Sequence, residues 1–109
     1  MKTATLLFLA ATLLATPHNI FAADANSAPV EITIDNFSFT PVDITVKAGT
    51  AITWKNRDDI PHTVVSTDNV FKSKALDTDE KFSFTPTKPG TYTYFCSIHP
   101  KMTAKVVVQ

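Results

Sequence analysis

From residue 31 onward the chain alternates apolar and polar residues over short segments, which is the pattern of half-buried β-strands. The alternation is clearest in Glu31–Asp35 and Asp43–Lys47, and turn-forming residues such as Pro41 and Gly49 separate such segments. No stretch shows a long helical period. We therefore expect an all-β fold, an antiparallel β-sandwich. The expected strands are residues 31–35, 37–39, 43–47, 51–56, 62–66, 82–84, 91–96 and 104–109.

The apolar positions on one face of these strands predict the core of the sandwich. They are Ile32, Ile34, Phe39, Ile44, Val46, Ile52, Trp54, Phe82, Phe84, Tyr92 and Tyr94. We interpret the aromatic residues among them as packing residues rather than as contacts to a cofactor. The segment Asp68–Asp79 fits either one short helix or an irregular loop.

The N-terminal segment has the pattern of a secretory signal peptide. Lys2 precedes an uncharged apolar run, Leu6–Leu14, and Ala23-Asp24-Ala25 fits a small-residue cleavage site. We expect residues 1–25 to be removed and residues 26–109 to form the mature domain, with cleavage after Ala22 as a close alternative. A membrane anchor is the competing interpretation, but the run is shorter than the about 20 residues that span a bilayer. The expected location is the periplasm.

Charge and cysteine content exclude some classes of function. Ten Lys and Arg balance ten Asp and Glu, so the net charge is zero and a general electrostatic nucleic-acid binder is not indicated. The single cysteine, Cys96, cannot form an internal disulfide. In an exported protein it is a dimer-forming thiol, a reactive thiol or a metal ligand, and a free thiol is a liability in an oxidising compartment.

Four residues near two expected loops form a candidate metal site. Without residues 1–25, the chain retains one Cys, two His and one Met: Cys96, His62, His99 and Met102. Three of them have the spacing Cys-x2-His-x2-Met, and His62 follows Ile60-Pro61 upstream. Two His and one Cys with a weak axial Met are the ligands of a blue-copper centre. Because thiolate and thioether suit Cu(I) and imidazole suits both oxidation states, the set favours one-electron transfer over zinc binding.

Four further segments carry a family resemblance. They are Trp54-Lys55-Asn56-Arg57, Ile60-Pro61-His62, Gly90-Thr91-Tyr92-Thr93-Tyr94-Phe95-Cys96 and Lys105-Val106-Val107-Val108. On these segments and the short Cys-x2-His-x2-Met loop the chain resembles the cupredoxins, and within them the amicyanin-like group related to plastocyanin and pseudoazurin. The resemblance implies a Greek-key β-sandwich with one type 1 copper ion at one end, bound by His62, Cys96 and His99 with Met102 as the axial ligand.

The chain departs from amicyanins at three positions near the expected site. Ile98 stands where amicyanins usually have Pro, so its N–H is available and we expect it to donate to the Cys96 sulfur and raise the reduction potential. Thr63 replaces a common Asn, and we expect its hydroxyl to link the two loops. Lys101 replaces an apolar residue. We interpret it, with Lys72 and Lys74, first as an ordinary solvated charge, and the alternative is that Lys101, with Lys72 or Lys74, lies at the rim of a docking face around His99.

The function expected from the resemblance is electron transport by a monomer that is not an enzyme. Its implied partners are redox proteins that bind transiently, such as a dehydrogenase, a cytochrome c or an oxidase, with no nucleic acid and no membrane insertion after processing. The alternative is a periplasmic protein that buffers or delivers copper. A copper enzyme is disfavoured because such enzymes need further His-rich copper sites, and no other His remains in the mature chain.

Overall fold

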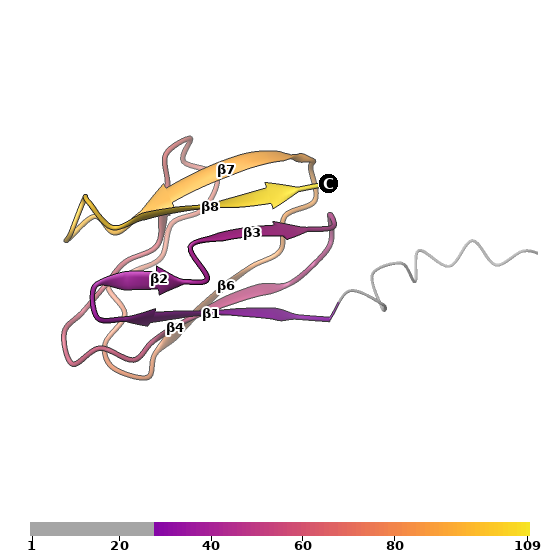
Figure 1. The fold of residues 1–109 in the computed structure, drawn as a ribbon. Helices are drawn as coiled ribbons and strands as arrows, with labels where there is room; N and C mark the ends of the chain where they lie inside the picture. Colours follow the sequence, from indigo (N-terminus) through magenta and orange to yellow (C-terminus); the bar gives the residue numbers. More distant parts are fainter. Residues whose placement is uncertain (1–27) are drawn as a thin grey trace, which may run out of the picture.

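The computed structural model describes residues 28–109, which form a sandwich of two four-stranded sheets (Figure 1). The expected β-sandwich is confirmed, and most expected strands lie within one or two residues of those observed. The signal peptide and the cleavage site predicted for residues 1–25 lie outside the described part of the chain. The strands are β1 (Val30–Asp35), β2 (Ser38–Thr40), β3 (Asp43–Val46), β4 (Ile52–Asn56), β5 (Val65–Ser66), β6 (Lys81–Phe84), β7 (Gly90–Phe95) and β8 (Thr103–Val108).

Both sheets are mixed, whereas the sequence pattern predicted purely antiparallel pairing. One sheet has the order β2-β1-β4-β6 and the other β3-β8-β7-β5. The pairs β1–β4 and β3–β8 are parallel, and the remaining pairs are antiparallel. The reason is the path of the chain: after the β1–β2 hairpin it crosses to the second sheet as β3 and then returns to the first as β4. Strand β4 therefore runs beside β1 in the same direction.

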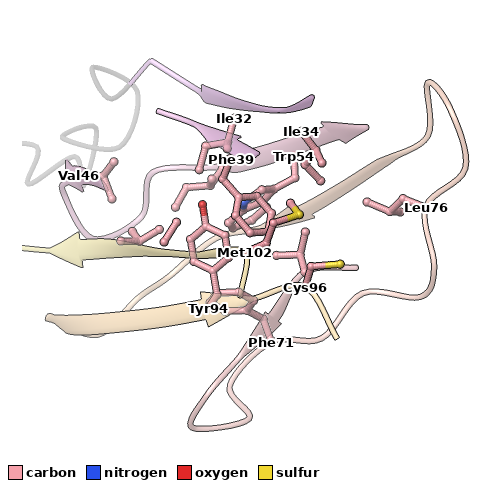
Figure 2. Close-up of a cluster of buried hydrophobic side chains, with 14 of the residues drawn as sticks. Ile32, Ile34, Phe39, Val46, Trp54, Phe71, Leu76, Tyr94, Cys96 and Met102 are labelled. Carbon is pink, nitrogen blue, oxygen red and sulfur yellow. The ribbon is translucent and has the colours of Figure 1, made fainter. Parts of the chain in front are cut away.

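The core lies between the sheets and includes most of the predicted positions (Figure 2). Aromatic rings of the two sheets meet there, with centroid distances of 4.7 Å for Phe39–Tyr94 and 5.4 Å for Trp54–Tyr94. Four predicted core residues (Ile44, Phe82, Phe84 and Tyr92) are only partly buried and pack against the edge of the cluster. The fully buried predicted residues are Ile32, Ile34, Phe39, Val46, Ile52, Trp54 and Tyr94.

The segment between β5 and β6 is an irregular loop, which settles the choice between helix and loop. Two buried serines shape it through main-chain contacts. The Ser66 hydroxyl accepts hydrogen bonds from the amides of Val70 (2.7 Å) and Phe71 (2.9 Å), and the Ser73 hydroxyl accepts one from Val64 (2.8 Å). Because side chains satisfy these amides, the segment needs no regular ladder, and it still buries Phe71 and Leu76 in the core.

One end of the sandwich gathers three connections that are far apart in sequence. The β1–β2 turn and the loop between β7 and β8 lie at the same end of the molecule in Figure 1. The segment after β4 joins them through hydrogen bonds between Asp58 and the β1–β2 turn. The expected strand at residues 62–66 is shorter than predicted: His62 makes only an isolated bridge with Leu76, and β5 begins at Val65. Among residues 28–109 no helix is long and apolar enough to cross a membrane.

Candidate metal centre

The loop that joins β7 to β8 is closed by its own backbone. The Cys96 amide donates to the Met102 carbonyl (3.1 Å), the His99 amide to Cys96 (3.2 Å) and the Met102 amide to His99 (2.9 Å). The flanking pair Phe95↔Thr103 continues the antiparallel ladder. Because the loop is short and internally bonded, it holds Cys96 and His99 close together at little cost in conformational entropy.

A buried asparagine shapes the segment that presents His62. The Asn56 side chain is fully buried, and its amide nitrogen donates to the carbonyls of Ile60 (2.9 Å) and Leu76 (2.8 Å). Its oxygen accepts from the Asp58 amide (2.9 Å). Two of these bonds fold residues 56–60 on themselves and the third ties them to the β5–β6 loop, so Asn56 fixes the path of the chain that leads into His62. In the sequence, Asn56 stood out only as part of the family resemblance.

The structure brings three of the four predicted residues together at this end of the sandwich. The candidate ligand atoms of His62, Cys96 and His99 all lie within 4.8 Å of one another. The Cys96 Sγ lies 3.6 Å from His62 Nδ1 and 3.8 Å from His99 Nδ1. His62 and Cys96 are fully buried, whereas His99 is half-buried. Two nitrogens therefore face one sulfur, and His99 is the most exposed of the three residues.

Met102, the fourth predicted residue, lies at the end of the same loop. Its side chain is 7% exposed and belongs to the buried cluster that also contains Cys96 (Figure 2). A buried methionine is ordinarily a packing residue, so burial alone does not separate packing from ligation. Its role as an axial ligand stays a prediction.

The thiol of Cys96 is arranged to ionise easily. Burial alone would raise its pKa, but the hydrogen bond from the Thr63 amide and the contacts of Sγ with the His62 and His99 rings lower the pKa to about 6. The thiolate is the form that binds metals, and a depressed pKa makes it available at neutral pH. The site therefore presents one soft anion and two imidazole nitrogens.

The hydrogen bonds to this sulfur differ from those predicted. The Thr63 amide donates to Sγ at 3.4 Å, and the Thr63 hydroxyl lies 3.8 Å from it. Within the described part of the chain the Ile98 amide makes no such bond, so the expected donation from Ile98 is wrong. The reason is the loop geometry: the next amide, that of His99, turns back to the Cys96 carbonyl. Without a hydrogen bond from Ile98 to the sulfur, the expected rise in the reduction potential has no structural basis.

Thr63 also links the two loops, as predicted. Its Oγ1 accepts from the Ser97 amide (2.7 Å) and shares a hydrogen bond with the Ser97 hydroxyl (2.7 Å). Since Thr63 follows His62 and Ser97 follows Cys96, these bonds hold the two candidate ligands in register. The threonine hydroxyl is long enough for this role.

A carboxylate that was not singled out in the sequence contacts His62 from the other side. Asp58 Oδ2 lies 2.7 Å from His62 Nε2, and the side chain is almost buried. Burial raises the pKa of Asp58, but hydrogen bonds from the amides of Phe37 and Asn36 and from His62 lower it overall. An ionised Asp58 accepts the Nε2 proton, which leaves Nδ1 free to face Cys96. This is the usual support that carboxylates give to metal-binding histidines. The feature of the sequence that could have indicated this contact is the position of Asp58, four residues before His62.

The surface around His99 is apolar and includes an unexpected residue. Ile98 is 48% exposed, and Phe37, at the β1–β2 turn, is 52% exposed. The Phe37 ring meets the His99 ring edge-on at a centroid distance of 5.0 Å. Phe37 was expected in a strand and lies instead in the turn. Of the candidate rim lysines, Lys101 is exposed, and Lys74 forms an ion pair with Glu80 (3.1 Å).

The chemistry of the donor set fits copper better than zinc. A buried thiolate and two imidazole nitrogens suit both copper oxidation states, whereas structural zinc sites favour four Cys or His ligands. The three convergent residues therefore fit a mononuclear copper ion, and Met102 lies at the end of the loop that holds Cys96 and His99.

Comparisons with known proteins agree with this geometry. Residues 3–108 match the family described as "Cupredoxin-like domain". The chain is 30% identical over 95 residues to the amicyanin of Paracoccus versutus, covering 83% of this chain and 72% of that protein. The structure resembles a purple cupredoxin from Nitrosopumilus maritimus, with a TM-score of 0.70, 30% identity and coverage of 73% of this chain and 99% of the other. It also resembles an amicyanin mutant solved in the Cu(I) form, with a TM-score of 0.71, 31% identity and coverage of 79% and 89%.

Proposed function

This chain belongs to the cupredoxin family and has copper as its cofactor, and from that premise we propose that it is an exported carrier of single electrons. In this proposal residues 26–109 form the mature domain, and His62, Cys96, His99 and Met102 bind one type 1 copper ion. The observation that supports it most directly is the convergence of one Sγ and two imidazole nitrogens within 4.8 Å. When bound, copper supplies a Cu(I)/Cu(II) couple that gains or loses one electron.

The protein's own residues keep the site similar in both oxidation states. Cys96 contributes a thiolate near neutral pH, because its hydrogen bonds lower its pKa to about 6. The Thr63–Ser97 bonds and the backbone bonds of residues 96–102 hold the ligands whether or not an electron has arrived. A site that moves little has a small reorganisation cost, which suits rapid electron transfer more than release of the metal.

His99 is the proposed point of electron entry and exit. Of the three convergent residues, it alone is only half-buried, and exposed apolar side chains, Phe37 and Ile98, surround it. An apolar contact of limited size suits a brief encounter with another redox protein, and such interfaces often bury less than about 1,200 Å². We propose transient redox partners, such as a dehydrogenase, a cytochrome c or an oxidase, for a monomeric protein in the periplasm.

An enzymatic role is not part of this proposal. Catalytic metal sites keep an open position for substrate. Here two His, one Cys and one Met would fill the positions of a single ion, and both His residues of the mature domain are already used. The proposed function is therefore electron transport alone.

The test is the visible spectrum of the purified mature domain after one equivalent of Cu(II), followed by ascorbate and reoxidation. We expect an intense thiolate-to-copper band that bleaches on reduction and returns. One relative is described as purple, so the position of the band is informative as well as its intensity. The matched control is Cys96→Ser, which should bind Cu(II) without showing the intense band. A colourless wild-type complex would contradict the proposal and favour the alternative of copper buffering or delivery.

A further inference from the structure

One carboxylate joins the β1–β2 turn to the candidate metal centre. Asp58 Oδ1 accepts from the Asn36 amide at 2.8 Å, and Oδ2 accepts from the Phe37 amide at 3.1 Å. The same Oδ2 lies 2.7 Å from His62 Nε2. Three N–H donors from two distant parts of the chain thus converge on one side chain. Both carboxylate oxygens of Asp58 therefore accept hydrogen bonds, and Oδ2 accepts two of the three.

The turn that Asp58 binds has an unusual backbone. Asn36 and Phe37 have φ values of 50° and 57°, and they are the two central residues between the paired Asp35 and Ser38. Two-residue hairpin turns with both central φ values positive favour Asn at the first position and Gly at the second. A phenylalanine there is strained, because in the left-handed region its Cβ comes too close to the following carbonyl oxygen. Such strain persists when surrounding contacts over-determine it, and it is found most often at functional sites.

The strained residue contacts the metal centre directly. The Phe37 ring lies edge-on to His99 at 5.0 Å and to His62 at 5.7 Å between ring centroids. A glycine at position 37 would relieve the backbone strain, but it would also remove the ring that contacts both histidines. The bonds from Asp58 to the turn therefore place an aromatic edge against both candidate histidine ligands.

We propose that Asp58 is a positioning residue of the metal centre, which orients His62 through Nε2 and holds Phe37 against His99 through the turn amides. This inference rests on the proposed function for its redox consequence, but not for its structural part. Acceptance of the Nε2 proton leaves His62 Nδ1 unprotonated toward Cys96. A carboxylate on Nε2 also makes the imidazole a stronger donor, which favours Cu(II) and lowers the reduction potential.

The matched pair of variants is Asp58→Asn and Asp59→Asn. Both remove one negative charge at adjacent positions of the same segment. Asp59 is exposed and takes part in no side-chain hydrogen bond within residues 28–109, so its variant reports the effect of losing an exposed charge in the same segment. In Asp58→Asn the new side chain has nearly the same shape, but it replaces one acceptor with a donor, which must face an N–H group.

The first measurement uses the metal-free protein and nitrogen NMR. In the wild type and in Asp59→Asn we expect His62 to carry its proton on Nε2, and the amides of Asn36 and Phe37 to exchange slowly. In Asp58→Asn we expect a mixture of His62 tautomers and at least about tenfold faster exchange of the two amides, since each loses a charged acceptor. If wild-type His62 is protonated on Nδ1, the inference is overturned even where Asp58→Asn does not fold. Unchanged tautomer and exchange in a folded Asp58→Asn would also overturn it.

The second measurement is voltammetry of the copper-loaded proteins. We expect a higher reduction potential for Asp58→Asn than for Asp59→Asn. Equal potentials would mean that the bond between Asp58 and His62 does not tune the metal centre, which overturns the orienting role. If the wild type fails to form a copper centre, the proposed function fails, while the NMR result in metal-free protein still decides the structural part.

Discussion

At the scale of single residues, Cys96 combines complete burial with a thiol that ionises easily. Burial opposes ionisation, and the Thr63 amide and the rings of His62 and His99 outweigh it, so the pKa falls from 9.0 to about 6. Two of these residues, Thr63 and His62, lie 33 and 34 positions away along the chain. The reactivity of this sulfur is therefore a product of the fold and not of its sequence neighbours alone.

This arrangement predicts a pH dependence of the metal-free protein. Because the folded pKa lies below the ordinary value of 9.0, the thiolate's contribution to the free energy of unfolding is complete above pH 9.0. It is lost as the pH falls through about 6. Titration of the thiolate ultraviolet absorbance should give a midpoint of about 6, with Cys96→Ser as the blank. A midpoint near the ordinary value of 9.0 would contradict the prediction.

Residues that act through others were the hardest to find from the sequence. Cys96, His62 and His99 were identified by type and spacing, and the structure brings them together. Asp58 and Phe37 were not identified, because an Asp in a polar loop and a Phe in an alternating segment have many ordinary roles. Their importance depends on hydrogen bonds and ring contacts with residues far away along the chain.

At the scale of elements, the segment after β4 depends on one buried side chain. Asn56 makes three side-chain hydrogen bonds that fix the path toward His62. Removal leaves the Ile60 carbonyl and the Asp58 amide without these partners, whereas the Leu76 carbonyl keeps the bond from the His62 amide (3.1 Å). Each buried unsatisfied group costs about 1–3 kcal/mol. The loop is thus more rigid than its composition suggests.

We expect Asn56→Ala to lower the free energy of unfolding by about 3 kcal/mol in urea denaturation of the metal-free protein. Asn56→Asp, which keeps the acceptor and loses both donors, should destabilise as well. The control is Asn69→Gly, which removes an exposed amide at a position with φ of 64° that glycine tolerates. Its effect should be near zero. A loss in Asn56→Ala no larger than that of the control would show that water replaces the three bonds.

The strands themselves followed closely from alternation, but their partners did not. The pattern placed β1, β3 and β7 within a residue or two and identified the inward face. It contained no information on the parallel pairs β1–β4 and β3–β8. Alternation is a property of one strand, whereas pairing depends on the route of the whole chain between the two sheets.

At the scale of the whole molecule, protein contacts connect all three segments that meet at the candidate site. Backbone bonds close the 96–102 loop, Thr63 ties it to the His62 segment, and Asp58 ties that segment to the β1–β2 turn. We therefore expect the metal-free domain to keep its fold, unlike small domains that fold only around a metal.

The corresponding prediction concerns removal of copper. Circular dichroism of the metal-free domain should match that of the loaded domain. Copper should add about 2.7 kcal/mol to the free energy of unfolding when its free concentration is about a hundredfold above the dissociation constant. Cys96→Ser should keep the fold but gain less from the same copper concentration. An unfolded metal-free wild type would mean that the site is assembled by the metal.

Two features can be read from the amino-acid order alone: the alternation that makes short strands, and the spacing of Cys96, His99 and Met102 on one loop. Both are local, because a strand's faces and a short loop's reach depend on the backbone between near neighbours. The folded chain was needed to show that His62 meets Cys96, that Thr63 rather than Ile98 donates to the sulfur, and that Asp58 joins Phe37 to His62. These contacts link segments distant in sequence, so they exist only once the two sheets have closed around a common core.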